Sequence, residues 1–389
     1  MFFIADEQDI KNGKVTDIYF KRTEKILKAK KIDVSVKAEV FLKSFPLGYN
    51  WGVLAGIEEG LKLLSSIGDI SVRCMPEGTV FTDYEPVMVI EGKYLNFGIY
   101  ETSILGFLCH SSGIATKAAR CKLAAGDRPV FNFGARRVHP VIAPMVERCA
   151  FLGGADGVST IAGAEAIGLE PVGTIPHALI LIMGDTVRAT KAFNEIIKPG
   201  VNRISLIDTF NDEKFEAIKV CEALGKSLFG VRLDTPSSRR GDFKKILEEV
   251  RWELDIRGYK DIKLVVSGGL DENDIIKLNC IADAYGIGTS ISGARTIDFS
   301  MDIVEIEGEK IAKRGKMSGA KKVIRCENCF TDKVVLDGVE ASDYRCEFCG
   351  GSYKDLFVDA IKNGELAYEF LPASKIREKV LNQFKFLEL

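Results

Sequence analysis

The feature that constrains this chain most is the alternation of short apolar runs with helical segments between residues 130 and 294. The runs are VFNF, GVSTI, PVGTI, RISLI, LFGVRL, KLVVS and AYGIG, and most are rich in β-branched residues. Such alternation is typical of parallel sheets, because each parallel pair of strands needs a crossover, usually a helix. Seven strand–helix units come close to an eight-fold barrel, so the pattern predicts an α/β domain, an irregular (β/α) TIM-like barrel, over 113–294. An open doubly wound sheet is the alternative.

The residues on either side predict further parts. Residues 1–112 mix strand-like runs with helical patterns, which indicates an N-terminal α+β domain. The segment IVEIEGEKIAK predicts a hairpin around Glu307 and Gly308, and we expect residues 295–325 to complete the first domain. Amphipathic patterns over 354–363 and 373–386 predict a helical tail over 354–389.

Polar or glycine-containing segments follow the seven runs, at the end of the strands where parallel sheets bind their ligands. In chain order these segments are Gly134 to His139, Ser159-Thr160, Thr174 to His177, Asp208-Thr209, Arg232 to Asp234, Ser267 to Gly269, and Gly286 to Thr289. We therefore expect them to meet at one mouth of the barrel.

The residue types in these segments suit a phosphorylated ligand. Arg136, Arg137 and Arg232 can each bind phosphate or carboxylate through two parallel hydrogen bonds. The pairs Gly268-Gly269 and Gly288-Thr289 would let backbone N–H groups approach a phosphate without an obstructing Cβ. Taken singly, each feature also has an ordinary structural explanation, namely a salt bridge on a rim or a turn.

Three further side chains are candidates for the chemistry. His177 follows a proline at a strand end, and a histidine near a carboxylate can carry a proton or accept a phosphoryl group. Asp208 and Asp234 can hold Mg²⁺ or stabilise a cationic transition state. A lone histidine is more often structural, and an aspartate before a helix is often an N-cap. The catalytic interpretation therefore depends on these residues sharing one site.

Two CxxC pairs lie close to the C-terminus. Cys326-x2-Cys329 and Cys346-x2-Cys349 are separated by 16 residues, a spacing typical of a structural zinc site. Four thiolates leave no open coordination position, so the pattern predicts a small zinc-ribbon-like module over 326–353 with a structural role. Iron bound by four cysteines is the alternative. Acidic side chains within the module argue against a nucleic-acid partner; they are Glu327, Asp332, Asp337, Glu340, Asp343 and Glu347.

Charge and hydropathy exclude several other classes of function. With 53 basic and 55 acidic residues the net charge is −2, which gives no global field to attract a polyanion. The N-terminus is acidic where a signal peptide would be basic and apolar. The longest uncharged run near the middle, residues 171–184, is shorter than the roughly 18 residues that suggest a membrane helix. We expect a cytoplasmic protein without a membrane or nucleic-acid partner.

Seven short motifs carry a family resemblance. They are Thr16 to Tyr19, Phe133 to Arg137, Gly153 to Gly157, Gly173 to His177, Arg232 to Asp234, Ser267 to Gly269, and Gly286 to Thr289. Their order resembles that of the nicotinate phosphoribosyltransferases, which are type II phosphoribosyltransferases. The segment Glu101 to Thr116 also resembles the related quinolinate enzyme.

The resemblance implies transfer of the phosphoribosyl group of phosphoribosyl pyrophosphate to nicotinate, with ATP hydrolysis coupled to the reaction and Mg²⁺ as cofactor. It implies that His177 is phosphorylated by ATP, that Arg232 binds phosphoribosyl pyrophosphate, and that Asp234 lies near the ribose or the metal. The remaining implied substrate and phosphate contacts are Asp17, Tyr19, Phe133, Arg136, Arg137, Thr174, Asp208, Gly268, Gly269, Gly288 and Thr289. Tyr19 would come from a neighbouring subunit and sandwich the pyridine ring with Phe133, which implies a homodimer with shared active sites or a larger assembly.

Some residues depart from the family pattern, and other functions stay open. The chain has Thr160 where the family usually has Asn, and Asp156 lies where nicotinamide-using relatives read the amide without deciding the substrate. The paired arginines favour a carboxylate, so nicotinate is preferred over nicotinamide, and quinolinate is less favoured. A metal-dependent barrel lyase or aldolase, and a non-enzymatic zinc-ribbon protein that binds RNA, are the alternatives from other classes.

Overall fold

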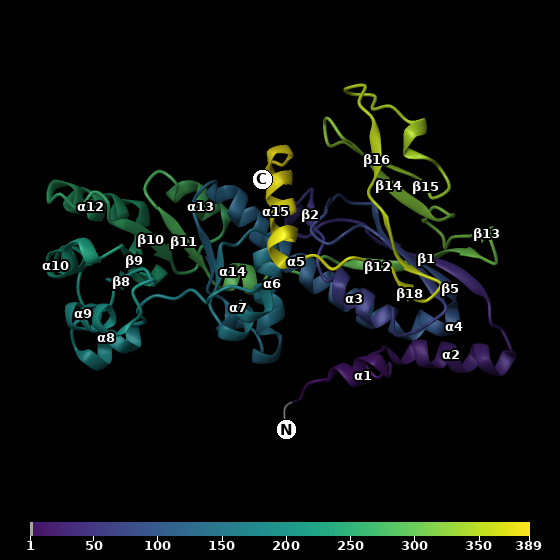
Figure 1. Ribbon diagram of the computed structural model, residues 1–389, viewed down its shortest axis with the longest axis horizontal. Helices are drawn as coiled ribbons and strands as arrows, with labels where there is room; N and C mark the ends of the chain where they lie inside the picture. The colour runs from purple at the N-terminus through teal and green to yellow at the C-terminus, as the bar shows by residue number, and fades with distance from the viewer. Residues whose placement is uncertain (1–2) are drawn as a thin grey trace. The chain divides into compact units, whose positions relative to one another are not determined.

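The computed structural model describes residues 3–389, which form two compact units (Figure 1). The first unit combines the chain up to Thr116 with Arg295–Glu388, and the second spans Lys117–Ala294 with Leu389. Helix α5 (Glu101–Ala125) contributes residues to both units.

The second unit is built on six parallel strands in the order β7-β6-β11-β10-β9-β8. Their bounds are β6 (Val130–Asn132), β7 (Gly157–Val158), β8 (Ile204–Leu206), β9 (Gly230–Leu233), β10 (Lys263–Ser267) and β11 (Ala284–Ile287). In the register, Val265 of β10 lies opposite Ala284 on one side and Arg232 on the other. The predicted mixed α/β domain with parallel strands is confirmed.

One predicted strand does not form. The run Pro171 to Ile175 has no strand assignment, although the Val172 N–H donates to the Val158 carbonyl at 2.8 Å. Pro171 and Pro176 have no backbone N–H, so this segment cannot supply a continuous ladder. Within the described residues β7 and β8 end the sheet unpaired with each other, so the sheet is a half-barrel rather than a ring closed by strand pairing.

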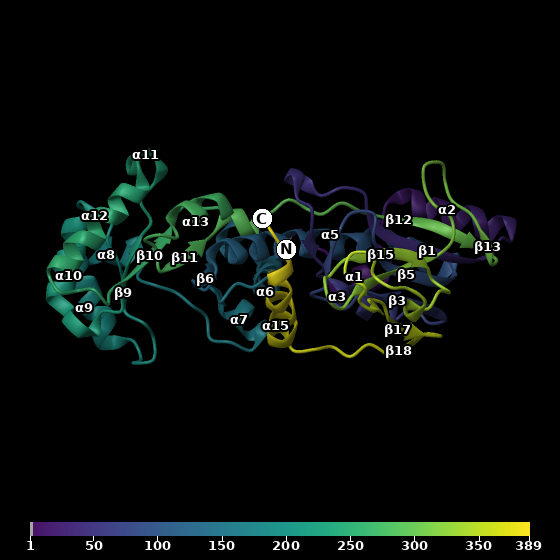
Figure 2. The same ribbon diagram turned by 90° about the horizontal axis from the view of Figure 1, so that it is seen from above.

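Helices alternate with these strands, and several begin at a residue whose side chain caps the helix. Their bounds are α6 (Ala143–Leu152), α7 (Ile161–Ile167), α8 (His177–Met183), α9 (Thr186–Ile196), α10 (Glu213–Leu224), α11 (Ser237–Arg240), α12 (Phe243–Ile256), α13 (Glu272–Leu278) and α14 (Thr289–Ser292). Asp185, Asp212 and Asp242 accept backbone N–H groups at the starts of α9, α10 and α12, and Asp271 forms a capping box at α13. Figure 1 shows α8, α9, α10 and α12 gathered around β8 and β9, and Figure 2 shows α11 standing apart beyond α12.

The first unit contains a seven-stranded sheet in the order β13-β12-β1-β5-β3-β17-β18. Its strands are β1 (Ser35–Leu42), β3 (Ile70–Cys74), β5 (Pro86–Lys93), β12 (Phe299–Ile306), β13 (Glu309–Lys310), β17 (Val358–Lys362) and β18 (Glu365–Leu366), and β2 (Gly52–Val53) pairs with β4 (Val80–Phe81) separately. The predicted hairpin is confirmed, with positive φ angles at Glu307 and Gly308. Because β12 pairs with β1, the chain after residue 295 does return to the first sheet.

Helices cover one side of this sheet. They are α1 (Glu7–Lys11), α3 (Ile57–Leu64), α4 (Tyr94–Phe97) and part of α5, while α2 (Ile18–Lys30) packs against residues 98–100. Helix α3 places Ile57, Leu61 and Leu64 at helical spacing, and all three are buried in one cluster with Val72 and Ile90 of the sheet. Figure 1 shows α3 and α4 on one side of the sheet and a three-stranded sheet on the other.

The first half of the predicted helical tail is wrong. Residues 353–362 form β16 (Tyr353–Asp355) and β17, and β17 pairs with β3. The edge of β3 offers unpaired backbone groups, and pairing with them overrides the local helical pattern. The second half of the tail is helix α15 (Ala373–Gln383), as predicted.

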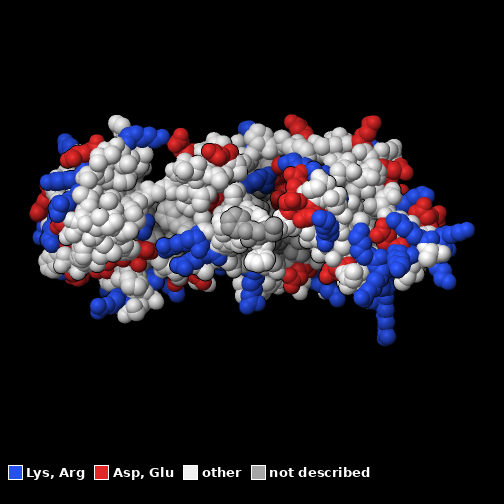
Figure 3. Space-filling view, turned by 90° about the horizontal axis from the view of Figure 1, so that it is seen from below, with Lys and Arg blue, Asp and Glu red and all other residues white. Residues whose placement is uncertain are grey.

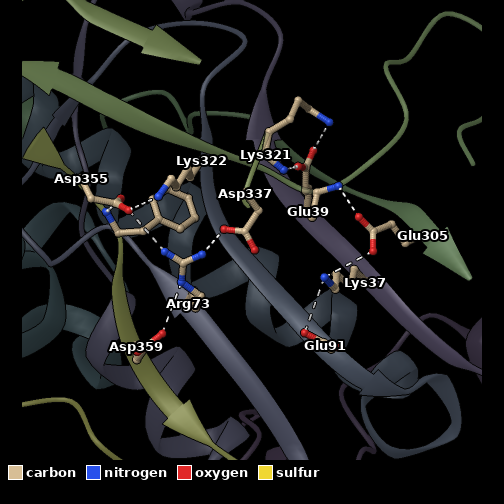
Figure 4. A network of polar contacts seen from close by, with 12 residues as sticks. Lys37, Glu39, Arg73, Glu91, Glu305, Lys321, Lys322, Asp337, Asp355 and Asp359 are labelled. Atoms are coloured by element: carbon tan, nitrogen blue, oxygen red, sulfur yellow. Dashed lines mark hydrogen bonds and ion pairs between the residues drawn. The ribbon is translucent and has the colours of Figure 1, made fainter. Parts of the chain in front are cut away.

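The three-stranded sheet β15-β14-β16 carries the CxxC pairs and is joined to the seven-stranded sheet by charged side chains (Figure 4). Its other strands are β14 (Lys321–Cys326) and β15 (Asp332–Leu336). Arg73 of β3 contacts Asp337, Asp355 and Asp359, which come from both sheets and the segments beside them. These contacts fix the segment that holds the cysteines to the main sheet.

The two tryptophans fall one in each unit. Trp51 of the first unit is 3% exposed, and its indole N–H donates to the Glu388 carbonyl at 2.7 Å. Trp252 on α12 is 66% exposed. None of the helices in residues 3–389 combines the length and apolar character needed to cross a lipid bilayer.

Candidate active site

A cavity of about 330 Å³ lies at the carboxyl ends of the parallel strands in the second unit. The residues that line it come from the last residues of β9, β10 and β11, from the turns after β6, β7, β9, β10 and β11, and from the segment 172–176. They are Phe133, Arg136, Arg137, Ser159, Val172, Gly173, Thr174, Pro176, Arg232, Asp234, Ser267, Gly268, Gly269, Gly286, Gly288 and Thr289. This is the edge at which parallel α/β sheets bind ligands.

The structure brings most of the residues singled out from the sequence to this cavity. Ten of them line it, and His177 and Asp208 lie against Asp234 beside it. Asp17 and Tyr19 belong to the first unit, at the start of α2, and line none of the described cavities of the second unit.

Arg232, Thr174 and Asp234 form a polar cluster on the cavity wall. The Arg232 guanidinium donates to the Thr174 hydroxyl at 2.5 Å, and its Nη2 lies 3.6 Å from Asp234 Oδ2. The Ser267 hydroxyl donates to Asp234 Oδ1 at 2.8 Å, which fixes the carboxylate. Burial lowers the pKa of Arg232, while Asp234 and Asp208 oppose that shift. Arg232 remains a cation at neutral pH, ready to meet a phosphate or carboxylate.

His177 begins helix α8 and lies between two carboxylates. Its Nδ1 is 3.0 Å from the Thr209 hydroxyl, and its Nε2 is 3.7 Å from Asp208 Oδ2 and 3.8 Å from Asp234 Oδ2. Asp208 is almost wholly buried, and neither of its carboxylate oxygens has a hydrogen-bond partner among the described residues. Burial raises the pKa of Asp208, and the nearby His177 opposes that shift. Nε2 is thus the ring nitrogen that faces the two carboxylates, while Nδ1 is held by Thr209.

Two glycines shape the turn after β10. Gly268 and Gly269 have φ angles of 94° and 68°, a region that side-chain-bearing residues rarely adopt. A Cβ on Gly268 would lie 3.1 Å from Asp234 Oδ1. Arg240 of α11 donates to the Gly268 carbonyl at 2.7 Å and so holds the turn from outside the cavity. Such a turn allows backbone N–H groups to approach an anion closely.

Phe133 supplies the aromatic surface of the cavity. Its ring is stacked on Phe131, with 6.2 Å between centroids, and the Arg232 guanidinium carbon lies 5.9 Å from its centroid. A Cβ on Gly286 would lie 2.5 Å from the Phe133 ring, so the neighbouring strand must carry glycine there. A flat ring between apolar and cationic neighbours suits an aromatic anion.

A second cavity of about 590 Å³ adjoins the first and shares Phe133, Arg136 and Ser159 with it. Its remaining lining comes from the segment 135–144 and from Thr160 and Ala162. Ser159, Ser267 and Gly286 were not singled out as site residues from the sequence, although each lies in a strand or turn that was. Asp156 lines neither cavity, because its carboxylate accepts from Lys122 Nζ and the Val130 N–H, so it has no contact with a ligand there.

The four cysteines of the CxxC pairs come together in the first unit. Their sulfur atoms all lie within 4.8 Å of one another, with Cys326 and Cys349 at 3.4 Å and Cys329 and Cys346 at 3.5 Å. Tetrahedral zinc bonded to sulfur at about 2.3 Å places its ligands roughly 3.8 Å apart. The donor set and spacing therefore fit a metal ion.

Two family models match consecutive parts of this chain. The model described as "Quinolinate phosphoribosyl transferase, N-terminal domain" matches residues 17–112. The model described as "Quinolinate phosphoribosyl transferase, C-terminal domain" matches residues 114–302.

Curated relatives are more specific. The chain is 30% identical over 329 residues to nicotinate phosphoribosyltransferase pncB1 of Mycobacterium tuberculosis, which covers 74% of this chain and 72% of the relative. It is 28% identical over 287 residues to nicotinate phosphoribosyltransferase of Bacillus subtilis, which covers 65% of this chain and 58% of the relative.

Solved structures agree with these matches. A nicotinate-nucleotide pyrophosphorylase from Pyrococcus furiosus superimposes with a TM-score of 0.97 and 54% identity, covering 100% of this chain and 99% of that one. Human nicotinic acid phosphoribosyltransferase superimposes with a TM-score of 0.75 and 17% identity, covering 96% of this chain and 94% of that one. The human match shows that the fold is shared.

Proposed function

Because this chain belongs to the nicotinate phosphoribosyltransferase family of type II phosphoribosyltransferases, we propose that it joins the ring nitrogen of nicotinate to C1 of phosphoribosyl pyrophosphate. The products are nicotinate mononucleotide and pyrophosphate, a reaction of NAD biosynthesis and salvage. The observation that carries the proposal is the meeting of Phe133, Arg232, Asp234 and the Gly268-Gly269 turn in one cavity.

The cavity residues suit each part of the reaction. Departure of pyrophosphate leaves positive charge on the ribose, and cationic groups must stabilise the leaving group. Arg232 would bind the pyrophosphate, while Gly268, Gly269, Gly288 and Thr289 would hold the 5′-phosphate. The half-buried Phe133 ring and Arg136 would position nicotinate so that its nitrogen approaches C1.

Mg²⁺ fits beside the same wall. Asp234 lies in the cavity, and the two oxygens of Asp208 have no hydrogen-bond partner among the described residues, so both carboxylates are available as hard oxygen ligands. When bound, Mg²⁺ supplies positive charge against the leaving pyrophosphate.

His177 would couple ATP hydrolysis to the reaction. We propose that the neutral ring keeps its proton on Nδ1, which donates to the Thr209 hydroxyl, while the unprotonated Nε2 forms a bond to the γ-phosphorus of ATP as the bond to ADP breaks. The contact between Nδ1 and Thr209 supports Nε2 as the reacting nitrogen. The added negative charge beside the pyrophosphate site would favour substrate retention and turnover.

A second copy of the chain would complete the base site. Tyr19 is 55% exposed on α2 and has the aromatic ring needed to cover nicotinate opposite Phe133. Figure 3 shows Lys and Arg side chains gathered over α2, which suits a helix that reaches towards phosphorylated substrates. We therefore propose a homodimer with shared active sites.

The Cys326, Cys329, Cys346 and Cys349 cluster would hold structural Zn²⁺. All four ligands are thiolates in a closed set, which leaves no position for substrate. This metal would have no part in the chemical step.

One assay tests the proposed reaction. The protein is incubated with phosphoribosyl pyrophosphate, Mg²⁺ and either nicotinate, nicotinamide or quinolinate, with and without ATP, and the nucleotide formed is identified by mass. We expect nicotinate mononucleotide from nicotinate, formed faster with ATP. Turnover confined to quinolinate or nicotinamide would assign a different base, and no turnover with any of them would contradict the proposal.

A further inference from the structure

A carboxylate without solvent exposure lies under the wall that the two cavities share. Glu147 of helix α6 is 0% exposed, and its partners are all in the turn that joins β7 to α7. This turn consists of Ser159, which lines both cavities, and Thr160, which lines the larger one.

The turn donates every hydrogen bond that Glu147 receives. Oε1 accepts from the Ser159 N–H at 2.8 Å, the Ser159 hydroxyl at 2.8 Å and the Thr160 N–H at 3.1 Å. Oε2 accepts from the Thr160 hydroxyl and, at 3.3 Å, from the Thr160 N–H. A buried carboxylate is tolerated where several donors of this kind compensate its lost hydration.

The same carboxylate also fixes the start of helix α7. The Thr160 hydroxyl accepts from the Gly163 N–H at 3.0 Å and is the N-cap of that helix. A Cβ on Gly163 would lie 1.9 Å from Glu147 Oε2, so glycine is required for α7 to pack against the carboxylate. The turn is thus held by Gly163, which is close in sequence, and by Glu147, which lies on another helix.

We propose that Glu147 is a positioning residue for the nicotinate-binding wall, acting through Ser159 and Thr160. It fixes the turn that faces the Phe133 ring and Arg136 across the shared part of the two cavities. Since the phosphate-binding glycines belong to the turns after β10 and β11, loss of the Glu147 contacts disturbs base binding more than phosphoribosyl pyrophosphate binding. The inference rests on the proposed function, because it names which substrate the wall serves.

The test compares Glu147→Gln with wild type and with Glu165→Gln, a matched change of an exposed carboxylate on α7. For each protein, kcat and the KM values for nicotinate and phosphoribosyl pyrophosphate are measured together with Tm. In Glu147→Gln, the side-chain NH₂ is a donor that faces the N–H and O–H donors of the turn, so hydrogen bonds to the turn are lost. We therefore expect the nicotinate KM to rise on the order of tenfold or more. The phosphoribosyl pyrophosphate KM should change by less than about twofold on the same reasoning, and the control should match wild type.

A second variant keeps the inference testable if Glu147→Gln does not fold. Thr160→Val removes, at nearly constant volume, the hydroxyl that joins Glu147 to the Gly163 N–H, and it should also raise the nicotinate KM. Thr160→Ser keeps a hydroxyl there, so its nicotinate KM should return towards the wild-type value. A fall in Tm with both KM values unchanged, or equal increases in both, would overturn the inference. Wild-type protein without turnover would instead contradict the proposed function on which the inference depends.

Discussion

His177 is the residue whose surroundings are most specific. Its Nε2 faces Asp208 and Asp234, and its Nδ1 contacts Thr209. We expect His177→Ala to bind nicotinate as wild type does but to lose the stimulation of nucleotide formation by ATP. Isothermal titration with nicotinate and rate measurements with and without ATP check this. Unchanged ATP stimulation in the variant would contradict the role given to this histidine.

The buried carboxyl of Glu85 should make the stability of the fold depend on pH. Burial raises the pKa of Glu85 to about 8 from its ordinary value of 4.5, and the neighbouring Asp332 adds to this shift. The folded state therefore holds a proton that the unfolded chain releases, so stability falls as pH rises from about 4.5 to about 8. We expect Glu85→Gln to flatten this decline and to raise Tm at pH 9 relative to wild type, as measured by thermal unfolding over a pH series. A steeper decline in the variant would show that the carboxyl is ionised in the folded protein.

The chemistry of the candidate site could be read from residue types in local motifs. Arginines, glycines and His177 were found because they follow strands at the edge where ligands bind. Ser159 and Ser267 were not singled out because their side chains act through contacts with Glu147 and Asp234, which are distant in sequence or on another strand. Glu147 could not be recognised, because nothing in the helix sequence marks a glutamate as the partner of a turn.

At the scale of elements, periodicity alone was a reliable guide where one strand or helix buries one face. It failed at residues 171–175, where two prolines limit the ladder, and at 354–363, where the edge of β3 provides pairing that local sequence does not encode. The hairpin at Glu307-Gly308 was predicted correctly because turn chemistry is local.

Replacing Arg73 measures how much its ion pairs between the two sheets of the first unit contribute to stability. Its guanidinium contacts Asp337, Asp355 and Asp359, so Arg73→Ala leaves three carboxylates close together without their cation. We expect a loss of about 2 kcal/mol in the free energy of unfolding, after allowing for solvent screening of this partly exposed cluster. Urea denaturation measures it, with the exposed Arg345→Ala as control. Equal stability of both variants would mean that the Arg73 contacts add nothing measurable to the join between the sheets.

At the scale of the whole molecule, the sequence indicated a parallel α/β part and a first part completed by later residues. The pairing of β12 with β1 agrees with that expectation. That residues 358–366 extend the same sheet was not foreseen, because the pairing of β17 with β3 joins residues too far apart for any local pattern to register. The seven motifs gave the family because their order, rather than any one of them, is specific.

The cluster of four cysteines provides a test at this scale. Cys329→Ser with Cys346→Ser removes two of four ligands, and we expect elemental analysis to fall from about one zinc per chain to none. Tm should fall with it, because the site is part of the fold of the first unit. Retained metal at one equivalent would place the ion elsewhere, and retention of iron instead of zinc in the unaltered protein would correct its identity.

Each unit contains one tryptophan, so the intrinsic fluorescence of each can be followed separately. The indole of Trp51 is buried and should emit at shorter wavelength, whereas the indole of Trp252 is exposed to solvent and should emit at longer wavelength. A Trp252→Phe protein would then keep a single tryptophan, Trp51, whose emission reports on the unit holding the cysteines. If the unfolding curve of this variant differs from that of the two-tryptophan protein, the two units unfold at different temperatures; if the curves coincide, they unfold together.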